Sequence, residues 1–119
     1  MAKIMVVDDA AFMRIRASKL LAEAGHTVVE ADNGLAAIET YKREQPDCVL
    51  MDITMPEMDG LDALDAIRRH DPTARVAMLT AMGQQPIVLD AIKRGARDFV
   101  VKPFQPDRVL SAVTRLLAG

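Results

Sequence analysis

The sequence predicts an α/β fold in which a parallel sheet is covered by helices on both faces. Short apolar runs rich in β-branched residues recur at strand length and span residues 4–7, 27–29, 48–51, 76–79 and 99–101. Longer stretches with the apolar spacing of helices follow these runs. Strands that are apolar on both faces and alternate with helices are typical of a parallel sheet joined by right-handed crossovers.

The first two strands each lead into a predicted helix. The first helix ends at Gly25, and its apolar residues at helical spacing are Phe12, Ile15, Ala17, Leu20 and Leu21. The second strand ends in the turn sequence Asp32-Asn33-Gly34, to which we assign no chemistry. The second helix follows this turn and ends before Pro46.

The remaining three strands are followed by helices in the same way. The third helix contains Leu61, Leu64 and Ile67 and ends before Pro72, and the fourth ends at Gly95. The apolar residues of the last helix are Val109, Leu110, Val113 and Leu116. Because no linker or low-complexity segment interrupts this alternation, we expect a single domain over residues 1–119.

Composition narrows the class of protein. Half of the 119 residues are hydrophobic, which is enough for one core, and the net charge is only −2, with Lys and Arg scattered singly. This balance disfavours a nucleic-acid or membrane-surface binder and favours protein partners. Cys48 lies in an apolar run and is expected to be a small buried hydrophobe. With no signal peptide and no apolar run of membrane-spanning length, the expected location is the cytoplasm.

Polar residues stand at the carboxyl ends of four predicted strands, where parallel α/β sheets form their sites. Asp8 and Asp9 follow the first strand, Asp52 the third, Thr80 the fourth and Lys102 the fifth. Clustered carboxylates repel one another, and a hard divalent cation relieves that repulsion. Mg²⁺ is commonly held by one or two carboxylates together with phosphate oxygens. The constellation therefore predicts magnesium-assisted phosphoryl chemistry.

Each of these residues also has an ordinary structural explanation. Asp9 could cap the first helix, Thr80 could be a β-branched strand residue, and Lys102 could be a solvated charge. Asp52 alone could be a turn residue. These explanations lose weight because all of the residues would converge on one edge of a small sheet.

Four motifs, in this order, make the chain similar to the receiver domains of response regulators. They are Val6-Val7-Asp8-Asp9, Met51-Asp52-Ile53-Thr54-Met55-Pro56-Glu57-Met58-Asp59-Gly60, Leu79-Thr80-Ala81 and Val101-Lys102-Pro103-Phe104. The resemblance covers essentially the whole chain. It implies one receiver domain, with a flavodoxin-like five-stranded parallel sheet of strand order 2-1-3-4-5 and five helices.

The resemblance implies a role for each site residue. Asp52 would be the phosphoacceptor that attacks a phosphohistidine of a sensor kinase. Asp9 would ligate Mg²⁺ directly and Asp8 mainly through water, with Asp52 and the backbone carbonyl of Thr54 completing the protein ligands. Lys102 would add positive charge beside the transferring group.

Thr80 and Phe99 would form the switch. We expect the Thr80 hydroxyl to be the nearest uncommitted donor on the fourth strand and to move toward an aspartyl phosphate. The ring of Phe99 would then turn inward and change the surface formed by the fourth helix, fifth strand and fifth helix. The resemblance also implies a cis Lys102–Pro103 bond.

Three positions depart from the enteric chemotaxis regulator. Thr54 stands where that regulator has Asn, and Met82 stands where it has Glu. Both positions influence the hydrolytic water, so the lifetime of the phosphorylated state does not transfer. Phe99 replaces a frequent Tyr and has no hydroxyl, so gating must work without one.

The segments 81–85 and 95–99 are similar to those of stand-alone chemotaxis regulators from thermophilic and Gram-positive bacteria. This resemblance implies a monomer that receives a phosphoryl group from a CheA-like histidine kinase and acts on the flagellar motor switch, with a phosphatase as a further candidate partner.

Other functions stay open. The chain could be the receiver of a longer DNA-binding regulator, or a stand-alone phosphorelay protein outside chemotaxis. An enzyme is not expected, because an aspartyl-phosphate phosphatase would need a second acid where Thr54 stands. A flavin binder is disfavoured because the carboxylates of Asp8-Asp9-Ala10-Ala11 would repel a phosphate.

Overall fold

The computed structural model describes residues 1–81 and 83–119 and contains the predicted alternation of strands and helices. In chain order the elements are β1 (Lys3–Val7), α1 (Ala11–Glu23), β2 (Thr27–Ala31), α2 (Gly34–Glu44), β3 (Cys48–Asp52), α3 (Gly60–His70), β4 (Val76–Ala81), α4 (Gln85–Lys93), β5 (Asp98–Lys102) and α5 (Pro106–Ala118). The predicted departure at Met82 lies outside the described residues.

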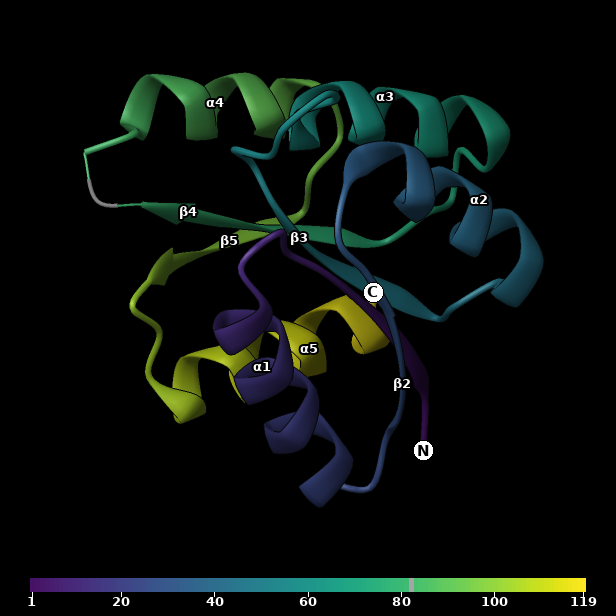
Figure 1. The fold of residues 1–119 in the computed structure, drawn as a ribbon, viewed down its shortest axis with the longest axis vertical. Helices are drawn as coiled ribbons and strands as arrows, with labels where there is room; N and C mark the ends of the chain where they lie inside the picture. The colour runs from purple at the N-terminus through teal and green to yellow at the C-terminus, as the bar shows by residue number, and fades with distance from the viewer. Residues whose placement is uncertain (82) are drawn as a thin grey trace.

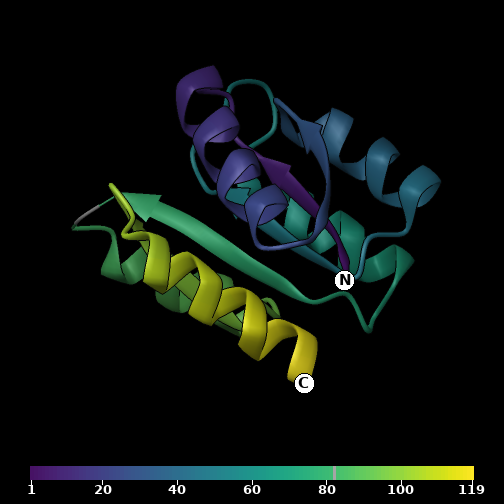
Figure 2. The ribbon, with the colours of Figure 1, turned by 90° about the horizontal axis from the view of Figure 1, so that it is seen from below.

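The strands form one sheet in the order β2-β1-β3-β4-β5, and every neighbouring pair is parallel. The predicted fold class and strand order are therefore confirmed. Helices α2, α3 and α4 lie on one face of the sheet and α1 and α5 on the other (Figure 1). Seen from below in Figure 2, α1 and α5 lie on the near side of the sheet.

Two buried clusters, one on each face, hold these layers together. The strand register places Val7, Met51 and Met78 in one row across three strands, and this row packs under the helices α2 and α3. The neighbouring residues Val6 and Leu50 point to the opposite face and pack against α1 and α5. Because both faces are covered, the central strands are apolar on both sides until their carboxyl ends, where β3 has Asp52 and β4 has Thr80.

The apolar spacing predicted the helix α1 but did not say which of its residues are buried. Phe12 and Ile15 are exposed, whereas Ala17 and Leu21 are buried against the sheet. The apolar residues of this helix surround its axis, so spacing alone could not show which of them face the core.

Turn residues after β2 and β3 cap the next helix. The Asn33 side chain accepts a hydrogen bond from the Ala36 amide at 2.8 Å, so the predicted turn at 32–34 also caps the start of α2. The Asp59 side chain likewise accepts from the Asp62 amide at 3.0 Å.

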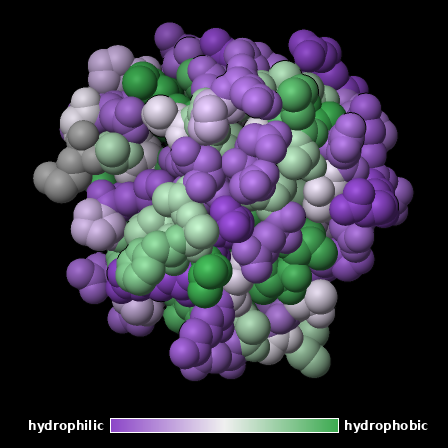
Figure 3. Space-filling model, viewed as in Figure 1, coloured by the Kyte–Doolittle hydropathy of each residue, from purple (hydrophilic) through white to green (hydrophobic). Residues whose placement is uncertain are grey.

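Cys48 is fully buried, and this burial raises the pKa of its thiol to about 12. The prediction that it is a buried hydrophobe is confirmed. On the face shown in Figure 3, hydrophilic side chains cover most of the surface and hydrophobic groups lie in separate patches. Among the described residues, no helix has the length and apolar character that a membrane crossing requires.

Candidate functional site

The predicted carboxylate cluster forms at the carboxyl edge of the sheet. Asp8 follows β1, and Asp52 is the last residue of β3. Together with Asp9 they offer one oxygen each, and these oxygens lie within 4.8 Å of one another. Asp8 and Asp52 are buried, whereas Asp9 is exposed. Oxygen donors at this separation match the ligand preference of Mg²⁺.

Lys102 reaches into this cluster from the end of β5. Its Nζ lies 2.9 Å from Asp8 Oδ2 and 3.4 Å from Asp52 Oδ2, and its side chain is only 19% exposed. Lys102 is therefore not a solvated surface charge. Its ammonium partly neutralises two buried carboxylates that would otherwise repel each other.

In the turn between β1 and α1, Asp8 and not Asp9 makes the side-chain hydrogen bond to the backbone. The Asp8 carboxylate accepts a hydrogen bond from the Ala10 amide at 2.9 Å, which fixes the turn. The N-cap of α1 is Ala10, without a side-chain cap, so Asp9 does not cap this helix. Asp9 projects an exposed carboxylate beside a buried one, an arrangement suited to an ion that keeps part of its water shell.

The loop after β3 packs closely under α3. A Cβ at Gly60 would overlap the Asp52 carbonyl oxygen, so only glycine allows this approach. The Gly60 amide also donates to the Ile53 carbonyl at 2.6 Å. These contacts hold the acceptor strand end in place. Thr54 is exposed on the same loop, and its role as a metal ligand stays a prediction.

Burial raises the pKa of Asp52 to about 6, and the nearby Asp8 charge adds to this increase while Lys102 opposes it. The anionic form of Asp52, which is the nucleophilic one, is therefore destabilised in the folded protein. A bound divalent cation would favour the anion and lower this pKa.

This pKa leads to a pH-dependent prediction. Because the folded state holds the Asp52 proton more tightly than the unfolded chain, its contribution to stability is present below about pH 4 and is lost as pH rises through about 6. In metal-free buffer, the free energy of unfolding of the wild type should fall by roughly 2–3 kcal/mol relative to Asp52→Asn between pH 4 and pH 7. Urea unfolding of both proteins across this range measures the difference. A constant difference would show that Asp52 is not destabilised by burial.

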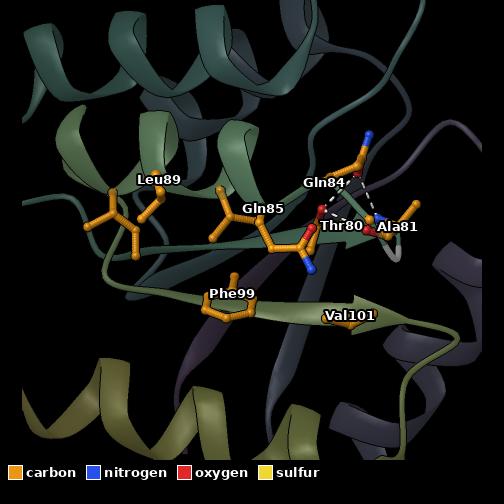
Figure 4. A pocket seen from close by; sticks show the side chains of 10 residues that line it. Thr80, Ala81, Gln84, Gln85, Leu89, Phe99 and Val101 are labelled. Carbon is orange, nitrogen blue, oxygen red and sulfur yellow. Dashed lines mark hydrogen bonds between the residues drawn. The ribbon is translucent and has the colours of Figure 1, made fainter.

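Thr80 follows Leu79, the β4 partner of Asp52, and its side chain is 1% exposed. Its hydroxyl donates to Gln84 Oε1 at 2.7 Å, as the dashed line in Figure 4 shows. The prediction that this hydroxyl is uncommitted is therefore wrong. The loop after β4 returns the Gln84 side chain to the strand end, and spacing along the sequence did not indicate this contact.

A pocket of about 700 Å³ opens between α4 and β5. Figure 4 shows Phe99 and Val101 along β5, facing Gln85 and Leu89 of α4. Thr80 also lines the pocket, so the two predicted switch residues share one cavity. Phe99 is 37% exposed, and its inward turn stays a prediction. The Lys102–Pro103 bond is cis, as the resemblance implies.

Comparison with known proteins identifies the family. A family model described as the response regulator receiver domain matches residues 4–114. The chain belongs to this family. Receiver domains work with a histidine kinase and a downstream target and generally use Mg²⁺. The acidic cluster of this receiver domain has the composition that such an ion requires.

Two curated relatives of this receiver domain are chemotaxis proteins. Chemotaxis protein CheY of Bacillus subtilis is 56% identical over 116 residues, which cover 97% of both chains. Chemotaxis protein CheY of Thermotoga maritima is 51% identical over 115 residues, covering 96% of both chains. The receiver domain therefore resembles CheY proteins along nearly its whole length.

Receiver domains of other regulators are also similar to this one. The solved receiver domain of NtrX from Brucella abortus is 33% identical, with a TM-score of 0.93, and the match covers 97% of this chain and 98% of that chain. Regulatory protein AtoC of Escherichia coli is 38% identical, but the match covers only 25% of its length. The same fold thus occurs both alone and within longer regulators.

Proposed function

We propose that the protein is a cytoplasmic phospho-accepting regulator, in which Asp52 takes a phosphoryl group from a histidine kinase. The observation that carries this proposal is the convergence of three carboxylates within 4.8 Å of one another, with the Lys102 ammonium 3.4 Å from Asp52. Mass spectrometry after incubation with acetyl phosphate and Mg²⁺ tests it, because phosphorylation adds the mass of one phosphoryl group.

The chemistry follows from these side chains. An Asp52 carboxylate oxygen attacks the phosphorus of a phosphohistidine, the P–N bond breaks, and the imidazole nitrogen keeps the electron pair. The Lys102 ammonium lies where negative charge gathers on the transferring group. Asp8, Asp9, Asp52 and the Thr54 carbonyl would hold Mg²⁺, which supplies further charge neutralisation when bound.

The output in this proposal is a protein surface formed by α4, β5 and α5. Four apolar side chains of α4 and β5 are exposed around the pocket: Leu89, Ile92, Phe99 and Val101. Exposed apolar side chains rimmed by polar ones are typical of protein interaction sites. Because the CheY relatives are chemotaxis proteins, we propose the flagellar motor switch as the target, a CheA-like protein as the kinase, and a phosphatase as a further partner.

The protein acts in this proposal as a monomeric phosphoacceptor, and not as an enzyme with its own substrate or as a direct nucleic-acid binder. The similarity to part of AtoC keeps a second function in view, that of a receiver within a longer or non-chemotaxis regulator. A flagellar-switch peptide discriminates between the two. Phosphorylation-dependent binding of this peptide favours the chemotaxis role, and its absence favours the alternative.

The metal part of the proposal predicts stabilisation by Mg²⁺. At ten times the dissociation constant, linkage adds about 1.4 kcal/mol to the free energy of unfolding, because only the folded state assembles the site. Thermal melts with and without millimolar Mg²⁺ should show a higher Tm in the wild type and no gain in Asp9→Ala. Asp107→Ala, which removes an exposed carboxylate from α5, is the control and should keep the full gain. An unchanged wild-type Tm would count against the metal site.

A further inference from the structure

Gln84 connects the end of β4 to the start of α4. Its side-chain oxygen accepts two hydrogen bonds, from the Thr80 hydroxyl at 2.7 Å and from the Ala81 amide at 2.8 Å (Figure 4). Its backbone carbonyl accepts the first helical hydrogen bond of α4, from the Val88 amide at 3.0 Å. One residue therefore contacts both Thr80, at the end of β4, and the helix that forms a wall of the pocket.

The backbone before Gln84 favours this contact. Gly83 has a φ of +84°, in the left-handed region that glycine adopts without strain, and a Cβ there would touch nothing within 4 Å. The glycine is therefore required for its conformation and not for space. With the chain turned in this way, the Gln84 side chain reaches back to the buried Thr80 hydroxyl.

The Thr80 hydroxyl has a single proton, so it can donate fully to only one acceptor. In this structure that acceptor is Gln84 Oε1, since the other oxygen in range, the Ala81 carbonyl, lies farther away at 3.3 Å. Donation to a phosphoryl oxygen on Asp52 therefore requires the Gln84 bond to break. The side-chain oxygen of Gln84 and the phosphoryl oxygen therefore compete for the hydroxyl proton of Thr80.

We propose that Gln84 is a regulatory residue, a latch that holds Thr80 in the unphosphorylated arrangement and is released when the phosphoryl group captures the hydroxyl. This inference rests on the proposed phosphorylation of Asp52. Release removes one of the two bonds that tie Gln84 to β4, which loosens the first turn of α4. Gln85 and Val88 of that helix line the pocket, so the signal reaches the output surface even before Phe99 turns.

The latch sets the affinity of the protein for a phosphoryl group. When the Thr80 hydroxyl must leave Gln84 Oε1 before it can donate to a phosphoryl oxygen, the phosphoryl group binds more weakly than it would to a hydroxyl that has no other acceptor. A net hydrogen bond of ordinary strength corresponds to roughly a threefold to tenfold change in an equilibrium constant. Removing the Gln84 acceptor should therefore tighten the binding of beryllofluoride, a phosphoryl mimic on Asp52, by about this factor.

The test compares three variants: Gln84→Met, its matched control Gln85→Met, and Gln84→Glu, which keeps an oxygen acceptor at position 84. Gln84→Met preserves the length of the side chain and removes its carbonyl oxygen, whereas Gln84→Glu retains an oxygen acceptor. Gln85→Met makes the same change at the next residue, which lines the same pocket and has no side-chain hydrogen bond among the described residues. Each protein is titrated with beryllofluoride in Mg²⁺ by NMR, and amide hydrogen exchange at Ala81 is measured without it.

In Gln84→Met, the Ala81 amide should exchange faster and beryllofluoride should bind roughly threefold to tenfold more tightly than in the wild type. Gln84→Glu should keep the Ala81 amide protected and bind no more tightly than the wild type, and Gln85→Met should match the wild type in both measurements. Wild-type affinity in Gln84→Met would overturn the latch while leaving the phosphorylation proposal intact. Failure of the wild type itself to bind beryllofluoride would instead contradict the proposed function.

Discussion

Thr80→Ala is expected to accept a phosphoryl group at Asp52 and yet to lose most of the phosphorylation-dependent gain in partner affinity. The substitution leaves the carboxylates and Lys102 in place, because Thr80 contributes none of their hydrogen bonds. It removes the only side-chain donor by which β4 would sense the new phosphoryl oxygens. Without that contact, phosphorylation loses its main means of favouring one arrangement of the pocket over another.

The expected result can be measured by titrating a flagellar-switch peptide against wild type and variant, with and without beryllofluoride. In the wild type the mimic should raise affinity, and by linkage the peptide should raise affinity for the mimic by the same factor. Thr80→Ser keeps the hydroxyl and should retain most of this gain. A full wild-type gain in Thr80→Ala would show that the signal bypasses Thr80.

The fold could be predicted from the sequence because each layer has its own periodic signal. The strands are short apolar runs in the sequence, and Val7, Met51 and Met78 of three such runs lie side by side in the sheet. The polar residues Asp52 and Lys102 fall at the ends of strands. Parallel strands bring such ends to one edge, so the cluster followed from the topology. Strands that are covered on both faces are continuously apolar in sequence, which is why all five strands were predicted correctly.

Contacts that depend on side-chain torsions and loop geometry could not be predicted in this way. The bond from Thr80 to Gln84 requires a left-handed Gly83 and a particular rotamer of Gln84, and neither has a periodic signal. The spacing of apolar residues in α1 likewise predicted a helix without showing that Phe12 and Ile15 are exposed, since spacing identifies a helix more readily than its buried face. The Asp9 cap was a reasonable alternative until the turn showed Ala10 in that position.

The central claim, that Asp52 is the phosphoacceptor, has the largest expected effect. Asp52→Asn keeps the size of the side chain and one acceptor oxygen but removes the nucleophilic oxygen anion, so phosphorylation should be lost entirely. The neighbouring Asp8 is an unsuitable substitute, because its carboxylate is bonded to the Ala10 amide and to Lys102.

The most direct measurement is mass spectrometry of the intact protein after incubation with acetyl phosphate. With Mg²⁺, the wild type and the exposed-site control Asp107→Asn should each gain one phosphoryl group, and chelation of the metal should prevent the gain. Asp52→Asn should show no added mass under the same conditions. If Asp52→Asn gained the same mass at the wild-type rate, the assignment of Asp52 as the phosphoacceptor would be wrong.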